Sequence, residues 1–161
     1  MASGKSTAAK KLAKKLGGEA GELDKENVKT AGMANPENFK TEGEMAFRKR
    51  EQDELRKWLE KDEFVMACGG GTPCFFESMD EMNGVGTSVY LQMTPKAVVD
   101  RVMASKEERP ILKGLPEEKM LKKVDFQIGK REPFYKRATI TVNGVNLDID
   151  ALAEELNNHS K

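Results

Sequence analysis

A glycine, a lysine and two hydroxyl residues stand near the start of this chain, directly before a helical pattern. The run Gly4-Lys5-Ser6-Thr7 matches the second half of G-x-x-x-x-G-K-[ST], a loop whose backbone N–H groups wrap polyphosphate. In such a loop the lysine reaches the β- and γ-phosphates of a nucleotide, and the hydroxyl binds Mg²⁺. Taken alone, these four residues would also fit a flexible chain start with an exposed lysine.

The residues that follow favour the phosphate loop. An apolar stripe at helical spacing comes next, formed by Ala9, Leu12, Ala13 and Leu16. Gly17 then supplies a helix stop. A helix in this place turns its N-terminus, which carries a partial positive charge, toward the loop and toward any anion bound there. The pattern therefore predicts ATP chemistry.

Composition argues against several other classes of protein. Among 161 residues, 27 Lys and Arg balance 27 Asp and Glu, whereas a nucleic-acid-binding chain usually carries a basic excess. A single histidine, His159, makes a histidine-based triad or a His-rich metal site untenable. No apolar run is long enough to span a membrane, and no secretory signal is recognisable. We expect one domain, 1–161, in a monomeric cytoplasmic protein, with Cys68 and Cys74 as buried or free thiols.

Helical and strand patterns alternate along the chain, which predicts an α/β fold with a central parallel sheet flanked by helices. Strands are expected at 19–24, 64–68, 88–93 and 138–142. Helices are expected at 44–61, from Pro95 with Thr94 as its cap, at 117–130, and at 148–157 with Asp148 as its cap. In the 44–61 helix one face is apolar, and charges are expected to cover the other; the apolar residues are Phe47, Leu55, Trp58 and Leu59.

Several polar features fall at strand ends or in loops, where open α/β sheets bind ligands. They are Asp24, Arg48, the triplet Gly69-Gly70-Gly71, Arg109 and Arg131. Each arginine could simply be solvated, and Asp24 could cap the helix that follows it. The three consecutive glycines are harder to explain in this way, because they destabilise any regular element. They favour a close approach between the backbone and a ligand.

Together these features resemble the shikimate kinases, small P-loop kinases of aromatic amino-acid biosynthesis. The matching segments follow the family's order over nearly the whole chain and comprise residues 2–7, 22–24, 42–48, 69–72, 109–112 and 131–135. The resemblance implies a P-loop kinase fold with a mobile lid at about 105–116 and a substrate-binding region at about 24–60. It also implies the reaction, in which ATP phosphorylates shikimate at its 3-hydroxyl with Mg²⁺ as the metal.

The resemblance further assigns roles on the acceptor side. Asp24 would bind the ring hydroxyls of shikimate and orient, or take the proton from, the attacking 3-hydroxyl. Arg48 and Arg131 would pair with the substrate carboxylate, which a planar guanidinium binds in a bidentate fashion. The glycines at 69–71 would bind substrate, with Gly70 and Gly71 offering backbone contacts to its hydroxyls.

On the nucleotide side, the resemblance assigns the phosphates to Gly4, Lys5, Ser6 and Thr7. Ser6 and Glu22 would bind Mg²⁺. Arg109 would close over the γ-phosphate with the lid and stabilise charge during transfer. Asn143 would belong to the loop beside the adenine, and Arg101 is the nearest candidate for a further nucleotide-side arginine.

The chain departs from the family at two places. In the family an apolar strand and a further loop glycine precede the position of Met1, and that strand lies in mid-sheet. A chain that began at Met1 is expected to leave two strands without a partner between them and to bind Mg·ATP poorly. At Glu22 the family usually has an aspartate. Two alternatives therefore remain beside shikimate phosphorylation: another small-metabolite kinase of the gluconate type, and a kinase fold that only binds ligand.

Overall fold

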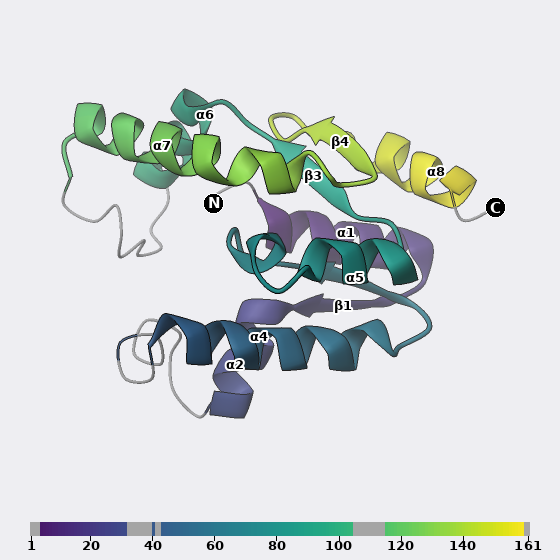
Figure 1. Cartoon of the computed structure of the whole chain (residues 1–161). Helices are drawn as coiled ribbons and strands as arrows, with labels where there is room; N and C mark the ends of the chain where they lie inside the picture. Colours follow the sequence, from purple (N-terminus) through teal and green to yellow (C-terminus); the bar gives the residue numbers. More distant parts are fainter. Residues whose placement is uncertain (1–3, 32–39, 41–42, 105–114, 160–161) are drawn as a thin grey trace.

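The structure, a computed structural model, describes residues 4–31, 40, 43–104 and 115–159 (Figure 1). Its helices and strands are α1 (Lys5–Leu16), β1 (Glu19–Glu22), α2 (Leu23–Ala31), α4 (Glu44–Leu59), β2 (Phe64–Ala67), the short 3-10 helix η1 (Thr72–Cys74), α5 (Ser78–Val85), β3 (Val89–Gln92), α6 (Pro95–Ala104), α7 (Glu117–Tyr135), β4 (Ile140–Asn143) and α8 (Ile149–His159). Most of the region expected to form a lid, residues 105–114, lies outside the described residues.

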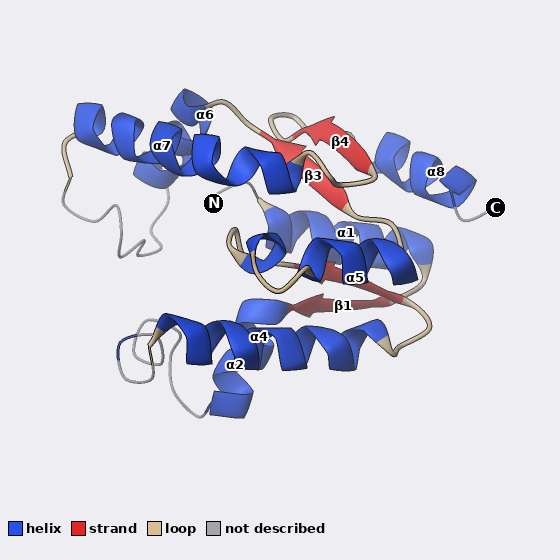
Figure 2. Ribbon diagram, in the orientation of Figure 1, coloured by secondary structure: helices blue, strands red, loops and turns tan. Residues whose placement is uncertain are grey.

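Four short strands form two parallel pairs (Figure 2). In the first pair β1 lies beside β2, with Glu19 opposite Phe64. In the second pair β3 lies beside β4, with Val89 opposite Ile140. The predicted α/β fold with parallel strands flanked by helices is therefore confirmed. Among the described residues, the sheet is divided between β2 and β3 rather than continuous.

A cavity of about 860 Å³ lies where the sheet is divided. Its walls include Val65 and Met66 of β2 and Val89 and Leu91 of β3. Helix α1 closes part of it with Leu12, and contacts β1, β2 and α8. Among the described residues, no strand lies between the facing edges of β2 and β3.

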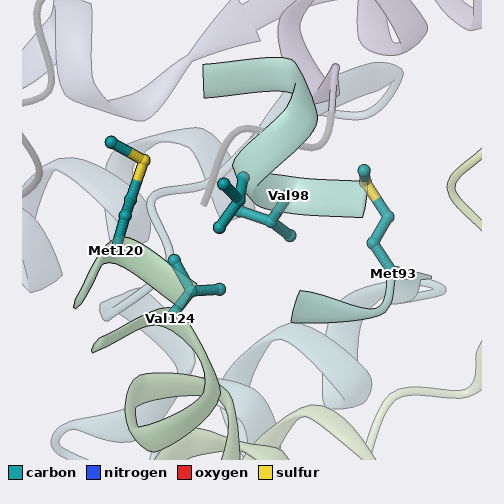
Figure 3. Packing of buried hydrophobic residues seen from close by; sticks show 5 residues of the cluster. Met93, Val98, Met120 and Val124 are labelled. Atoms are coloured by element: carbon teal, nitrogen blue, oxygen red, sulfur yellow. The ribbon is translucent and has the colours of Figure 1, made fainter. Parts of the chain in front are cut away.

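Two apolar clusters join the helices to the strand pairs. Between α6 and α7, Val98 and Val99 pack with Met120 and Val124, and Met93 closes the end of the cluster (Figure 3). The second cluster links α1, β4 and α8 through Leu12, Ile140, Leu152 and Ala153. Figure 1 shows α6 and α7 beside the β3–β4 pair, and α2 and α4 beside β1. No described helix is long and apolar enough to cross a membrane.

The predicted helix boundaries are confirmed at three ends. Gly17 ends α1 with φ 79°, a left-handed conformation that glycine adopts without strain. The Thr94 hydroxyl accepts a hydrogen bond from the Ala97 N–H at 3.2 Å and caps α6. The Asp148 carboxylate accepts one from the Ala151 N–H at 3.0 Å and caps α8.

The structure differs from the sequence analysis in three helices. The helix expected at 117–130 continues through Pro133 to Tyr135, so Arg131 lies inside it rather than at its end. A proline near a helix end removes only one late hydrogen bond, and contacts of Tyr135 described below compensate for that loss. Helix α5 was not foreseen. Exposed charges cover one face of α4 as expected, but two further glutamates, Glu51 and Glu54, are buried.

Candidate active site

The glycine turn after β2 lies against two of the predicted site residues. A Cβ atom added to Gly71 would lie 2.4 Å from Nη2 of Arg48, and one added to Gly69 would lie 3.0 Å from Oδ1 of Asp24. Gly71 has φ −90° and ψ −14°, which any residue adopts, so its need for glycine is one of space. The turn therefore brings Asp24, from the start of α2, and Arg48, from the start of α4, to the ends of β1 and β2.

Arg48 is held firmly rather than solvated. Its side chain is 11% exposed, and its Nη1 donates to Oε1 of Glu51 at 3.0 Å. The guanidinium lies over the rings of Phe47 and Phe75, at 5.2 and 4.6 Å from their centroids. Its buried Nε has no hydrogen-bond partner among the described residues. A buried donor without a partner is costly, so this atom marks a place where an acceptor from a ligand would be favourable.

Glu51 anchors this arginine, and sequence analysis overlooked it. The residue is 3% exposed, and its Oε2 accepts a hydrogen bond from the Thr72 hydroxyl at 3.1 Å. Burial raises the pKa of Glu51, while Arg48 and Thr72 act in the opposite direction. The signal was present in the sequence, because position 51 falls one helical turn from Phe47 and one from Leu55, on the apolar face.

Arg131 reaches the same turn from α7. The Tyr135 hydroxyl donates to the carbonyl oxygen of Gly70 at 2.5 Å, and the Arg131 side chain is hydrogen-bonded to Tyr135. Burial raises the pKa of Tyr135, against the opposing effect of Arg131 and, more weakly, of Arg48. Burial also raises the pKa of Cys74, and both arginines oppose that shift too. Two guanidinium groups from different helices therefore lie beside the glycine turn, both within electrostatic reach of Tyr135 and Cys74.

The start of α1 lies close to this turn. Gly4 has φ 79°, and the helix begins at Lys5. Burial raises the pKa of Cys68 to about 12, and the largest opposing effect is the charge of Lys5. Because Cys68 directly precedes the glycine turn, Lys5 lies near Gly69 and Gly70, and all three line the same cavity. The predicted phosphate loop and the predicted acceptor site are thus adjacent.

Ser6 and Glu22 also meet at the start of α1. Hydrogen bonds from Lys25 first, and then from Ser6, lower the pKa of Glu22, which stays ionised. Lys25 also forms an ion pair with Glu22 at 2.6 Å. Thr7 is exposed on the first turn of α1. This end of the helix therefore brings a hydroxyl, a carboxylate and the ammonium group of Lys25 into one small region.

Arg101 connects the phosphate-loop side to the segment after β4. Its Nη2 donates to the Gly144 carbonyl at 3.0 Å, and a Cβ added to Gly4 would lie 2.7 Å from its Nη1. Asn143, at the end of β4, accepts a hydrogen bond from the Val145 N–H at 2.9 Å and shapes the turn there. Arg109 lies outside the described residues. All other predicted site residues lie at the same edge of the two strand pairs, where the strands end.

A helix N-terminus with a lysine at its start, beside a glycine turn that holds two arginines and an aspartate, defines a small-molecule kinase with a phosphate-binding loop. Comparison with known proteins refines this class. A sequence model of the family described as SKI, shikimate kinase, matches residues 1–160. The chain belongs to the shikimate kinase family, as its sequence predicted.

Similar proteins support this assignment in sequence and in structure. The chain is 38% identical over 142 residues to a shikimate kinase of Bacteroides fragilis, covering 86% of this chain and 77% of that protein. It is similar to the crystal structure of shikimate kinase from Bacteroides thetaiotaomicron, with TM-score 0.91, 30% identity and coverage of 99% and 93%. A shikimate kinase from Acinetobacter baumannii in complex with shikimate gives TM-score 0.82, 28% identity and coverage of 99% and 88%.

Proposed function

We propose that the groups at this edge carry out the reaction of the shikimate kinase family, transferring the γ-phosphoryl group of ATP to the 3-hydroxyl of shikimate. The observation that carries this proposal is the convergence of Asp24, Arg48 and Arg131 on the glycine turn. An acceptor that carries a carboxylate and several ring hydroxyls needs protein cations beside its carboxylate. It also needs a protein carboxylate and backbone groups beside its hydroxyls. The turn offers both.

Each acceptor-side group has a chemical task that suits its surroundings. Arg48, with its buried and unpartnered Nε, and Arg131 pair with the carboxylate of shikimate. Gly69, Gly70 and Gly71 allow the ring to approach the backbone closely. Asp24 binds ring hydroxyls and accepts the proton of the attacking 3-hydroxyl as the new P–O bond forms.

The nucleotide side supplies charge for the transfer. ATP is the co-substrate of this family, and Gly4, Lys5, Ser6 and Thr7 stand at the N-terminus of α1, where backbone N–H groups and the helix dipole favour phosphate. Lys5 neutralises the β- and γ-phosphates. Asn143 shapes the turn beside the base. On the family resemblance, Arg109 stabilises the charge that develops on the transferred group.

Ser6 and Glu22 fit Mg²⁺ binding. Mg²⁺ prefers one or two protein oxygen ligands and completes its shell with phosphate oxygens and water. A hydroxyl hydrogen-bonded to an ionised carboxylate at the head of α1 matches that preference. When bound, the ion would neutralise charge on the nucleotide phosphates. Lys25 would have to release Glu22 for this role.

Since one chain supplies all these groups, we propose that it acts as a monomer.

An acceptor-dependent assay of ADP release with Mg·ATP tests the proposal. Shikimate should stimulate ADP release, and gluconate should not. Arg131→Ala should weaken shikimate binding by about 2–3 kcal/mol, because it removes a charge-assisted contact, and should leave ATP binding unchanged. Lys5→Ala should weaken ATP binding and leave shikimate binding unchanged. Stimulation by gluconate would indicate the other kinase class, and shikimate binding without turnover would indicate a fold that only binds ligand.

A further inference from the structure

The Tyr135 hydroxyl connects two parts of the proposed acceptor site that lie far apart in the sequence. It donates to the carbonyl of Gly70, 65 residues earlier in the chain, and it is hydrogen-bonded to Arg131 one turn back on α7. The ring is held in place by the ring of Tyr90, with centroids 5.0 Å apart and an angle of 40° between the planes. The hydroxyl therefore has fixed partners on both sides.

We propose that Tyr135 is a positioning residue for the acceptor, which sets the spacing between the guanidinium of Arg131 and the backbone of the glycine turn. This inference rests on the proposed function. Its physical basis is the planar trans peptide between Gly70 and Gly71, in which the Gly71 N–H points opposite to the Gly70 carbonyl. Fixing that carbonyl therefore fixes the direction in which the Gly71 N–H is offered to a ligand.

The rest of the turn leaves this peptide dependent on Tyr135. The Gly69 carbonyl accepts from the Thr72 N–H at 3.2 Å, and the Gly71 carbonyl accepts from the Cys74 N–H at 3.0 Å. For the Gly70 carbonyl, the other described contact is the weak donor Sγ of Cys74, at 3.9 Å. Because burial raises the pKa of Tyr135, the phenol keeps its proton at neutral pH and remains a donor.

Tyr135→Phe removes only the hydroxyl and tests the proposal. The acceptor is bound by this turn before and during transfer alike, so the substitution should raise KM for shikimate and leave kcat unchanged. We expect a rise of about tenfold, the scale of one buried hydrogen bond with a cationic neighbour. KM for ATP should change by less than about twofold, because the described partners of the Tyr135 hydroxyl, Gly70 and Arg131, belong to the proposed acceptor side.

Tyr90→Phe is the matched control. It removes the hydroxyl of Tyr90, which donates to Oε2 of Glu132 at 3.4 Å, and keeps the ring that packs against Tyr135. The hydrogen bond from Tyr135 to Gly70 stays in place. Its KM for shikimate should stay within about twofold of the wild-type value. A residue with a merely structural role would instead lower the melting temperature and the active fraction without changing KM.

Combining Tyr135→Phe with Arg131→Ala separates this inference from the proposed function. If Tyr135 acts through Arg131 and the turn, the two effects on shikimate affinity should be clearly less than additive. An unchanged KM in Tyr135→Phe, or full additivity, would overturn the positioning role while Arg131→Ala alone still supports the proposed function. If shikimate fails to stimulate the wild-type protein, the proposed function itself is wrong.

Discussion

The acceptor side and the nucleotide side of this site are built in different ways. On the acceptor side, the guanidinium of Arg48 is buried, paired with Glu51 and enclosed by two aromatic rings. On the nucleotide side, the groups belong to the first turn of α1, and Thr7 at that turn is exposed. Under the proposed function, recognition of the acceptor therefore depends on side chains that tertiary packing must fix, whereas recognition of phosphate depends on the direction of one helix.

This difference links acceptor specificity to stability. A buried ion pair exchanges the hydration of two charges for one interaction, and it is stable only while both partners and their hydrogen bonds are present. Glu51 has Arg48 and Thr72 as partners, so the same contacts that hold the fold also aim the arginine. The nucleotide side has no such requirement, because backbone N–H groups at a helix start need no buried counter-charge.

The strongest test of this comparison is Glu51→Ala. It would leave the buried Arg48 without its carboxylate and should lower the free energy of unfolding by about 3–5 kcal/mol, measured by urea denaturation. Lys96→Ala is the control, because its pair with Asp100 is exposed on both sides and should contribute nothing measurable. If both variants lost the same free energy of unfolding, the buried Arg48–Glu51 pair would contribute no more to stability than an exposed pair.

Gly71→Ala tests the acceptor side without changing a charge. The new methyl group would overlap Nη2 of Arg48, which is too tightly held to move freely, so shikimate affinity should fall by about tenfold while ATP affinity is unchanged. The control is Gly84→Ala in α5, where the added Cβ meets nothing within 4 Å and should leave both affinities unchanged. Titration of each ligand distinguishes the outcomes. A loss of ATP affinity in Gly71→Ala would mean that the two sides are not separable.

The pH dependence of stability gives the smallest effect. Because burial raises the pKa of Glu51 above its ordinary value of 4.5, the folded state binds more protons than the unfolded state between that value and the raised pKa. The free energy of unfolding therefore falls as pH rises through this window. Urea denaturation at several pH values measures how the free energy of unfolding changes with pH. In this window Glu51→Gln should lack the decrease that the wild-type protein shows. An identical slope in both proteins would contradict the assignment of the raised pKa to Glu51.

Local patterns predicted most of the fold. The stripe from Ala9 to Leu16, the Thr94 and Asp148 caps and the strand at 64–68 each depend on neighbours in sequence, and each is found within a few residues of its expected place. The end of α7 was missed because a proline normally terminates a helix, and here a contact with Gly70, distant in sequence, outweighs that tendency. Helix α5 carries a glycine and mixed polarity, so its sequence gave little periodic signal.

The sequence predicted the residues proposed to bind ligand, but not the residues that hold them in place. Asp24, Arg48 and Arg131 belong to motifs, and the structure places them around one turn. The supporting residues Glu51, Thr72 and Tyr135 make contacts across 21 and 65 residues of sequence, so no local pattern could predict those contacts, although Thr72 and Tyr135 lie in the matching segments 69–72 and 131–135. One local feature did indicate such a supporting residue: Glu51 is a charged residue on the apolar face of a helix.

The cavity between β2 and β3 has a mechanical consequence. Protein interiors normally pack as densely as organic crystals, and unfolding under pressure is favoured by the volume that disappears when internal voids are lost. The cavity of about 860 Å³ between the two strand pairs is lined partly by apolar side chains such as Leu12, Val65 and Val89, and only the part of it that excludes water adds to the volume lost on unfolding. Hydrostatic pressure should therefore favour loss of packing at this division of the sheet. Helix α1, which packs beside this division, begins at Lys5, the lysine that we propose binds phosphate, so pressure that loosens the division should also weaken the proposed nucleotide side.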